Sequence, residues 1–213
     1  MRSYGQYCSV ARALDAIGDR WNLLIARELL LRGACRYTDL LNGLPGIATN
    51  LLADRLRELE RAGIIAREDA PPPIAATLFS LTPRGEELAP VVRELGRWGV
   101  ALMTEPVGEA AFRSRWLRLP VELFLSDHAP ERPPVEIELR TGDEPMTVST
   151  EHGDVHTRPG PAERPDLVLT GTPQVMLGVL SGRLALAQAG ERGLRCEGDP
   201  AVLERLRPLP VRA

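Results

Sequence analysis

The feature that most constrains the fold is a tight proline-glycine turn between two amphipathic segments. The turn is Leu44-Pro45-Gly46-Ile47-Ala48, and residues 49–62 after it carry Leu52, Leu56 and Leu59 at helical spacing. Gly63 ends this second segment as a helix C-terminal stop. Two helices joined by so short a turn are typical of a helix-turn-helix unit, in which the second helix is presented outward.

The segments around this turn follow a fixed order of three helices, a hairpin and one more helix. We expect helices over residues 8–17, 21–31 and 37–44, and a hairpin of strands 64–67 and 77–81 around a proline-rich tip. A long helix then opens at Thr82-Pro83, with threonine as cap and proline at the first helical position. Its apolar stripe is Leu88, Val91, Val92, Leu95, Trp98 and Leu102. This order predicts a winged helix-turn-helix domain.

The side of residues 49–62 that faces away from the buried leucines is the predicted DNA-reading surface. Asparagine can bond two edges of adenine, arginine two acceptors of guanine, and a threonine or alanine methyl can meet the thymine methyl. The expected DNA contacts are Thr49, Asn50, Ala53, Asp54 and Arg57, with Arg36 and Arg67 from outside this helix. The same spacing also fits an amphipathic helix with a solvated charged face, and this alternative stays open on pattern alone.

The overall charge argues weakly against a nucleic-acid partner, because the net charge is −3. Residues 1–105 carry 13 arginines and 13 acids, whereas residues 106–213 carry 13 arginines and 16 acids, so the surplus acid lies in the second half. All 26 basic residues are arginine, which pairs bidentately with phosphate or guanine. A nucleotide bias of the source genome is the simpler explanation for the absence of lysine.

The second half of the chain has a different pattern of expected elements, with more strands than the mainly helical first half. The predicted boundary between the halves is Glu105-Pro106-Val107-Gly108. We expect domains at residues 1–105 and 106–213. The second domain is expected to begin with an amphipathic helix and to continue with four strands, a helix, a last strand and a closing helix. The expected helices are 110–125, 173–180 and 200–206, and the expected strands are 135–139, 145–150, 154–158, 166–171 and 194–197. The predicted fold class is therefore α+β.

Several motifs in the first half resemble the HxlR family of MarR-related regulators, in collinear order over residues 4–103. The motifs are Tyr7-Cys8-Ser9-Val10, Gly18-Asp19-Arg20-Trp21, Arg36-Tyr37-Thr38-Asp39-Leu40, residues 44–48, residues 55–60, Ala62-Gly63-Ile64-Ile65, Leu81-Thr82-Pro83-Arg84-Gly85 and Trp98-Gly99. The resemblance implies a homodimeric DNA-binding regulator whose first and last helices form the dimer interface.

The length of the apolar stripe in the last helix also favours dimerisation, although packing within one chain is the alternative. Two departures from the family pattern matter. Ala48 stands where the family often has a capping serine, which weakens that cap. The wing tip Pro71-Pro72-Pro73 lacks basic residues, which puts a charged wing contact in doubt.

Residues 135–209 resemble the sterol-carrier-protein fold, with helices on a roughly five-stranded sheet. The matching segments are 165–171, 177–182, 185–189 and 194–200, of which Gly198-Asp199 before a closing helix is the most recognisable. The resemblance implies an apolar ligand site. Its expected lining is Trp116, Leu123, Phe124, Val135, Ile137, Met146, Leu169, Met176 and Leu180. For each of these residues, ordinary core packing is the alternative.

Catalysis and cofactors find little support in the sequence. His152, Asp154 and His156 are too loosely spaced for a metal site, so we expect no metal, no cofactor and no enzyme. The three cysteines form no disulfide framework, and Cys8 is a redox candidate, because some HxlR-type proteins sense oxidants through a thiol at the matching place. Without a signal core or a membrane-length apolar run, a cytoplasmic protein is expected.

Two functions are therefore compared. The first is a dimeric transcriptional regulator of double-stranded DNA, controlled by an apolar molecule bound in the C-terminal domain. The second is a lipid carrier whose helical half serves only for dimerisation. The helix-turn-helix pattern favours regulation.

Overall fold

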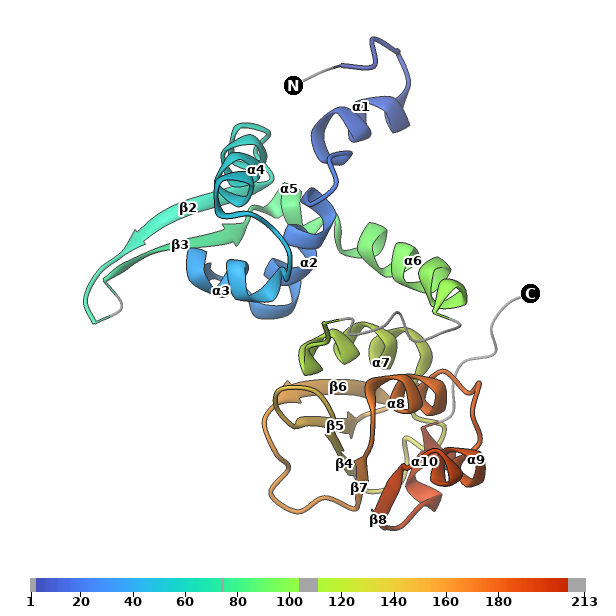
Figure 1. Cartoon of the computed structure of the whole chain (residues 1–213). Coiled ribbons are helices and arrows are strands. Elements are labelled where there is room, and N and C mark those ends of the chain that lie inside the picture. The colour runs from blue at the N-terminus through green and yellow to red at the C-terminus, as the bar shows by residue number, and fades with distance from the viewer. Residues whose placement is uncertain (1–2, 74, 104–110, 207–213) are drawn as a thin grey trace. The chain divides into compact units, whose positions relative to one another are not determined.

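The computed structural model of the chain describes residues 3–73, 75–103 and 111–206 (Figure 1). Helices and strands occur in both halves, which confirms the α+β class. The chain divides into two units, Met1–Leu95 and Gly96–Ala213. The boundary predicted at residues 105–108 lies outside the described residues. Within the described ranges, no helix has both the length and the apolar character needed to cross a membrane.

The first unit is a winged helix-turn-helix. Its elements are α1 (Ser9–Ile17), α2 (Asn22–Arg32), β1 (Cys35–Arg36), α3 (Tyr37–Gly43), α4 (Thr49–Arg61), β2 (Ile65–Ala70), β3 (Ala76–Leu81) and α5 (Pro83–Glu86), followed by α6 (Ala89–Gly99), which continues into the second unit and ends in the 3₁₀ turn η1 (Val100–Leu102). The helices predicted at residues 8–17, 21–31, 37–44 and 49–62 are confirmed as α1 to α4, and the predicted hairpin is confirmed as β2 and β3. The hairpin strands are longer than predicted, so the wing extends further from the core.

Strand β1 was not predicted. It has two residues, and it forms because Cys35 pairs with Phe79 and Arg36 with Leu78 of β3. The resulting sheet has the order β1-β3-β2. Its inner face contributes Cys35 and Phe79 to a core that also holds the buried leucines of α4.

The helix predicted to run unbroken from Thr82-Pro83 is interrupted at Glu87 and Leu88, so that prediction was wrong. Pro90 explains the break. Proline has no backbone N–H, and its ring clashes with the carbonyl four residues earlier, which here belongs to Glu86. Pro90 is instead the second residue of α6, a position where the missing N–H costs little.

The base of the wing is fixed to α5 through Thr82 and Gly85. The Thr82 hydroxyl accepts the Gly85 N–H at 3.1 Å, which confirms the predicted cap, and donates to the Gly63 carbonyl at 2.6 Å. A Cβ on Gly85 would lie 2.1 Å from the Ile64 carbonyl oxygen. Only glycine allows so close an approach of α5 to the start of β2.

The second unit places helices on a five-stranded sheet. Its elements are η2 (Ser114–Leu117), α7 (Arg118–Phe124), β4 (Glu136–Arg140), β5 (Met146–Glu151), β6 (Asp154–Pro159), β7 (Leu167–Thr170), α8 (Pro173–Leu180), α9 (Leu186–Glu191), β8 (Arg195–Gly198) and α10 (Ala201–Arg205). The strand order is β6-β5-β4-β7-β8, with β4 and β7 parallel and the other neighbours antiparallel. Helices α7 and α8 lie over one face of this sheet (Figure 1).

The predicted strands and the helix over 173–180 are confirmed in this unit, but two elements differ. The first helix begins later than predicted, as a 3₁₀ turn at Ser114; the first predicted residue, Ala110, lies outside the described residues. Helix α9 was not predicted. The turn between β5 and β6 holds His152 at φ 51° and Gly153 at φ 93°, the left-handed pair of a tight hairpin turn.

Candidate nucleic-acid interface

Helix α4 is held by its leucines and by its first residue. Leu52, Leu56 and Leu59 are buried in the core of the first unit. The Tyr37 hydroxyl donates to the Thr49 carbonyl oxygen at 2.6 Å, which fixes the start of α4 to α3. Ala48 provides no side-chain cap, as the sequence predicted, and the Leu51 N–H donates to the Asn50 side chain at 2.9 Å instead.

The side of α4 opposite these leucines is a row of four exposed side chains at i, i+4, i+7 and i+11. They are Asn50, Asp54, Arg57 and Arg61, here called the outer face of α4. Of the other predicted contacts, Thr49 is exposed at the helix start, whereas Ala53 is half-buried at the flank. The helix therefore brings three of the five predicted α4 residues onto one surface.

Arg61 is a residue that the sequence reasoning missed. It is exposed in the last turn of α4, and no ion pair joins it to another described residue. Extending the spacing of Asn50 and Arg57 by one further turn would have found it. An unpaired guanidinium on this face suits a phosphate.

Arg57 is paired before any DNA arrives. Its Nη2 lies 2.6 Å from Oδ1 of Asp54, and its Nε donates to the Ala53 carbonyl at 3.3 Å. Both side chains are more than half exposed. The guanidinium is thus held along the helix, and contact with a base requires it to swing outward or to bring Asp54 with it.

The two predicted arginines outside α4 lie on opposite faces of the wing sheet. Cys35, Phe79 and Arg67 occupy one cross-strand row, and Arg36, Leu78 and Glu68 occupy the next. Directly opposed residues in antiparallel strands share a face, and successive residues alternate. Arg67 therefore lies on the inner face beyond the core, and Arg36 on the outer face, so the sheet does not bring them together.

Arg55 has a positioning role rather than a place on the outer face. Its side chain is 16% exposed, and Nη1 lies 2.7 Å from Oε2 of Glu58. The same nitrogen pairs with Asp19 in the turn between α1 and α2. This network ties the flank of α4 to the turn after α1.

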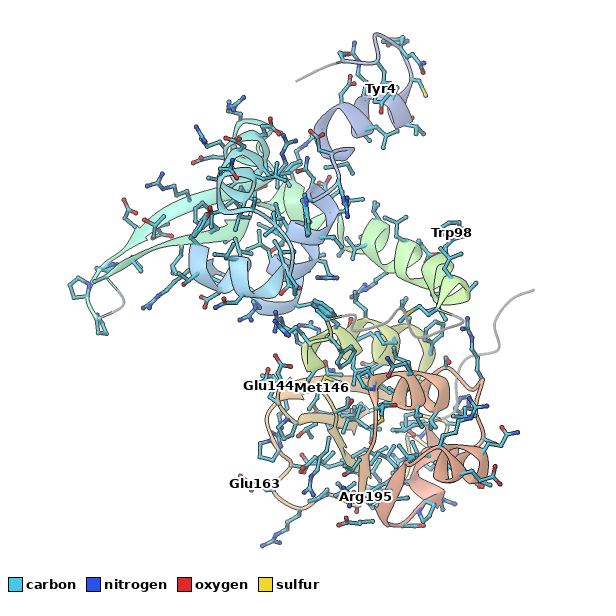
Figure 2. The ribbon with its side chains drawn as sticks, viewed as in Figure 1. Tyr4, Trp98, Glu144, Met146, Glu163 and Arg195 are labelled. Carbon is cyan, nitrogen blue, oxygen red and sulfur yellow. The ribbon has the colours of Figure 1, made fainter. Side chains whose placement is uncertain are left out.

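Two helices of the chain expose apolar side chains that a folded monomer leaves in water. On α1 and just before it these are Tyr7, Val10 and Leu14. Along α6 and η1 they are Val91, Leu95, Trp98 and Leu102, here called the α6 stripe. Trp98 is 69% exposed and projects outward from α6 (Figure 2).

Cys8 is an exposed thiol directly before α1. The backbone amide of Ala11, and then that of Val10, lowers the pKa of this thiol from its usual value. A larger thiolate fraction and an exposed position are what the redox hypothesis requires, and that hypothesis stays a prediction.

The residues predicted to line a ligand site lie in the core of the second unit or at its margin. Five of them, Ile137, Met146, Leu169, Met176 and Leu180, belong to one buried cluster between the sheet and the helices. Leu123 and Phe124 are buried on α7, and Trp116 is half-buried with its ring edge-on to Phe112. Within the described part of the chain, no cluster of three or more histidine, cysteine or carboxylate side chains could hold a metal.

A buried ion pair joins the last helix of the second unit, α10, to the segment between α7 and β4. Arg205 of α10 binds both carboxylate oxygens of Asp127, through Nε at 2.7 Å and Nη2 at 2.8 Å. Nη1 also donates to the Pro133 carbonyl at 2.6 Å. The side chains are 8% and 1% exposed, and the Arg205 hydrogen bond lowers the pKa of Asp127.

Comparison with known proteins places the first half among DNA-binding regulators. Residues 16–106 match the family described as HxlR-like helix-turn-helix. An HTH-type transcriptional regulator of Synechocystis sp. is 38% identical over 95 residues, which cover 45% of this chain and 70% of that protein. The regulator YodB of Bacillus subtilis is 34% identical over 86 residues, covering 40% of this chain and 76% of YodB.

The solved structure of the redox regulator HypR in its oxidized form is 31% identical, with a TM-score of 0.42, and the match covers 47% of this chain and all of that one. The family and the relatives named above are transcriptional regulators and not enzymes. They do not favour the alternative of a lipid carrier.

Proposed function

The chain belongs to the HxlR-like helix-turn-helix family, and on that premise we propose that it is a homodimeric, sequence-specific transcriptional regulator. The observation that carries the proposal is the outer face of α4. It presents the Asn50 amide and the Arg57 guanidinium, which can read adenine and guanine edges in the major groove, and the Arg61 guanidinium, which suits a phosphate, on one exposed helix side.

The exposed apolar side chains of α1 and the α6 stripe support the proposal of a dimer. A two-fold dimer would hold two copies of α4 about one DNA turn apart, so the operator is expected to be a pseudo-palindrome. The wing strands add no net positive charge to this contact, because the exposed Glu68 and Asp69 of β2 outnumber Arg67, and the tip is made of prolines.

Substitutions on the outer face of α4 test DNA reading. Asn50→Ala and Arg57→Ala are each expected to weaken operator binding by about 1–3 kcal/mol, because each removes a base contact. Arg61→Ala is expected to weaken binding to all sequences alike, because it removes a phosphate contact. The slope of the logarithm of the binding constant against the logarithm of the salt concentration should become shallower by about one. The operator is first obtained by selection from random DNA, and affinities are measured by titration at several salt concentrations.

The matched control is Arg192→Ala, which removes an exposed arginine from the second unit. Its titration midpoint is expected to equal that of the natural sequence. Midpoints unchanged by all three α4 substitutions would reject the assignment of this face.

We further propose that an apolar molecule bound in the second unit controls DNA binding. Five of the expected lining residues belong to the buried cluster, and among them the flexible Met146 and Met176 adapt most readily to a bound molecule. Linkage requires that a compound weakening DNA binding tenfold itself binds about tenfold more weakly to the DNA complex.

A thermal-shift screen of fatty acyl, isoprenoid and polyketide-like compounds against the full chain tests the effector. One class is expected to raise the melting temperature and to shift operator affinity. Arg57→Ala serves as control, since it should retain the thermal shift while losing operator affinity. A screen with no stabilising compound, together with native mass spectra free of bound ligand, counts against the effector.

A further inference from the structure

The outer face of α4 carries an acid at its centre. Asp54 lies between Asn50, one turn before it, and Arg61, two turns after it, and it is exposed. A carboxylate at this place meets the phosphates of any DNA that approaches the helix, and the two repel each other.

Stability of the helix does not account for this acid. The Asp54–Arg57 pair is an i,i+3 pair with side chains 53% and 66% exposed, and such surface pairs contribute little to folding. The pair instead changes what the face offers to DNA. With Asp54 at 2.6 Å, Arg57 meets a phosphate only after losing its partner or while carrying a negative charge with it.

The cost of bringing the Asp54–Arg57 pair to DNA is smaller at a base pair that offers hydrogen-bond partners to both side chains. Guanine offers two acceptors to an arginine, and its partner cytosine offers an amino group that a carboxylate can accept. Over such a base pair, neither member of the Asp54–Arg57 pair loses its hydrogen bonding. Over phosphates, the carboxylate faces acceptors only. Over an A·T pair, adenine also offers an amino group, but thymine gives the arginine one acceptor where guanine gives two.

We infer that Asp54 is a specificity-determining residue, which lowers affinity for DNA of random sequence and selects G·C base pairs beneath the Asp54–Arg57 pair. The inference rests on the proposed function, since it concerns the same face of α4. The inference and a purely structural role of the Asp54–Arg57 pair predict different effects on DNA binding. Removal of Asp54 must affect operator and random DNA in opposite directions.

Three variants of the full chain test this. Asp54→Ala removes both the charge and the acceptor, and Asp54→Asn removes the charge but keeps an acceptor oxygen. Glu60→Gln is the matched control, because Glu60 is an exposed acid of the same helix outside the outer face. Thermal unfolding checks that each variant keeps its fold. Dissociation constants are measured for the selected operator and for a random duplex of equal length.

Asp54→Ala is expected to bind random DNA a few-fold more tightly, with a salt dependence steeper by about one ion. Its operator affinity is expected to fall at least about fivefold, because a base contact is lost. Sites selected by this variant should lose their G·C preference at the positions under the pair. Asp54→Asn should retain part of that preference, and Glu60→Gln should change both affinities by the same factor.

Equal gains for operator and random DNA in Asp54→Ala, of the size seen in Glu60→Gln, would overturn the inference and leave the proposed function intact. Failure of the natural sequence to bind any selected duplex would overturn both.

Discussion

Replacing Leu95 with arginine is expected to convert the dimer into monomers and to abolish tight operator binding. Leu95 is 47% exposed in the single chain, so it contributes little to the core and the fold should persist. In a dimer closed by the α6 stripe, the substitution removes an apolar contact of about 1.5–3 kcal/mol and buries a charge that costs several kcal/mol more. The dimer dissociation constant should therefore rise by more than about 100-fold.

Sedimentation velocity and operator titration measure the two effects together. Leu95→Met keeps the volume and apolar character of the side chain, and it should remain dimeric with nearly unchanged DNA affinity. A stable Leu95→Arg dimer that binds the operator would place the interface elsewhere on the chain.

Breaking the Asp127–Arg205 pair is expected to have the largest effect on stability. Arg205→Met leaves a carboxylate buried at 1% exposure without its partner and releases α10 from the Pro133 carbonyl. Removal of one member of a buried pair costs about 3–5 kcal/mol. Calorimetry of the full chain should show this loss in the transition of the second unit, whereas Arg192→Ala should melt like the natural sequence.

The same pair predicts an acid dependence of stability. Because the pKa of Asp127 is lowered in the folded chain, its contribution is fully present above the ordinary aspartate value of about 4 and is lost as the pH falls through the folded value. Asp127→Asn should be less stable at neutral pH, and its stability should change less between about pH 4 and pH 2. Parallel pH profiles for the two proteins would contradict the assignment.

Patterns of residues close together in the sequence determined most of the helices and strands of this protein. The leucines of residues 49–62 predicted both α4 and its buried side, because a helix repeats every 3.6 residues whatever surrounds it. Thr82-Pro83 predicted the cap of α5 for a similar reason, since the cap is formed by residues within one turn. Alternating apolar and polar residues predicted strand β4, and the turn at residues 151–153 predicted the strands β5 and β6 on either side of it. The break before α6 was also accessible from the sequence, because Pro90 acts on its own helix.

Only the tertiary structure decided the features that depend on residues far apart in the chain. Strand β1 exists because Phe79 and Leu78 pair with it, and the same register separates Arg36 from Arg67. The Asp127–Arg205 clamp joins positions 78 residues apart. The Asp54–Arg57 pair is local. However, it lies on an exposed surface only because the opposite side of α4 packs into the core. Sequence periodicity fixes the conformation of a segment, whereas pairing across the chain depends on packing that brings distant residues within a few ångströms of each other.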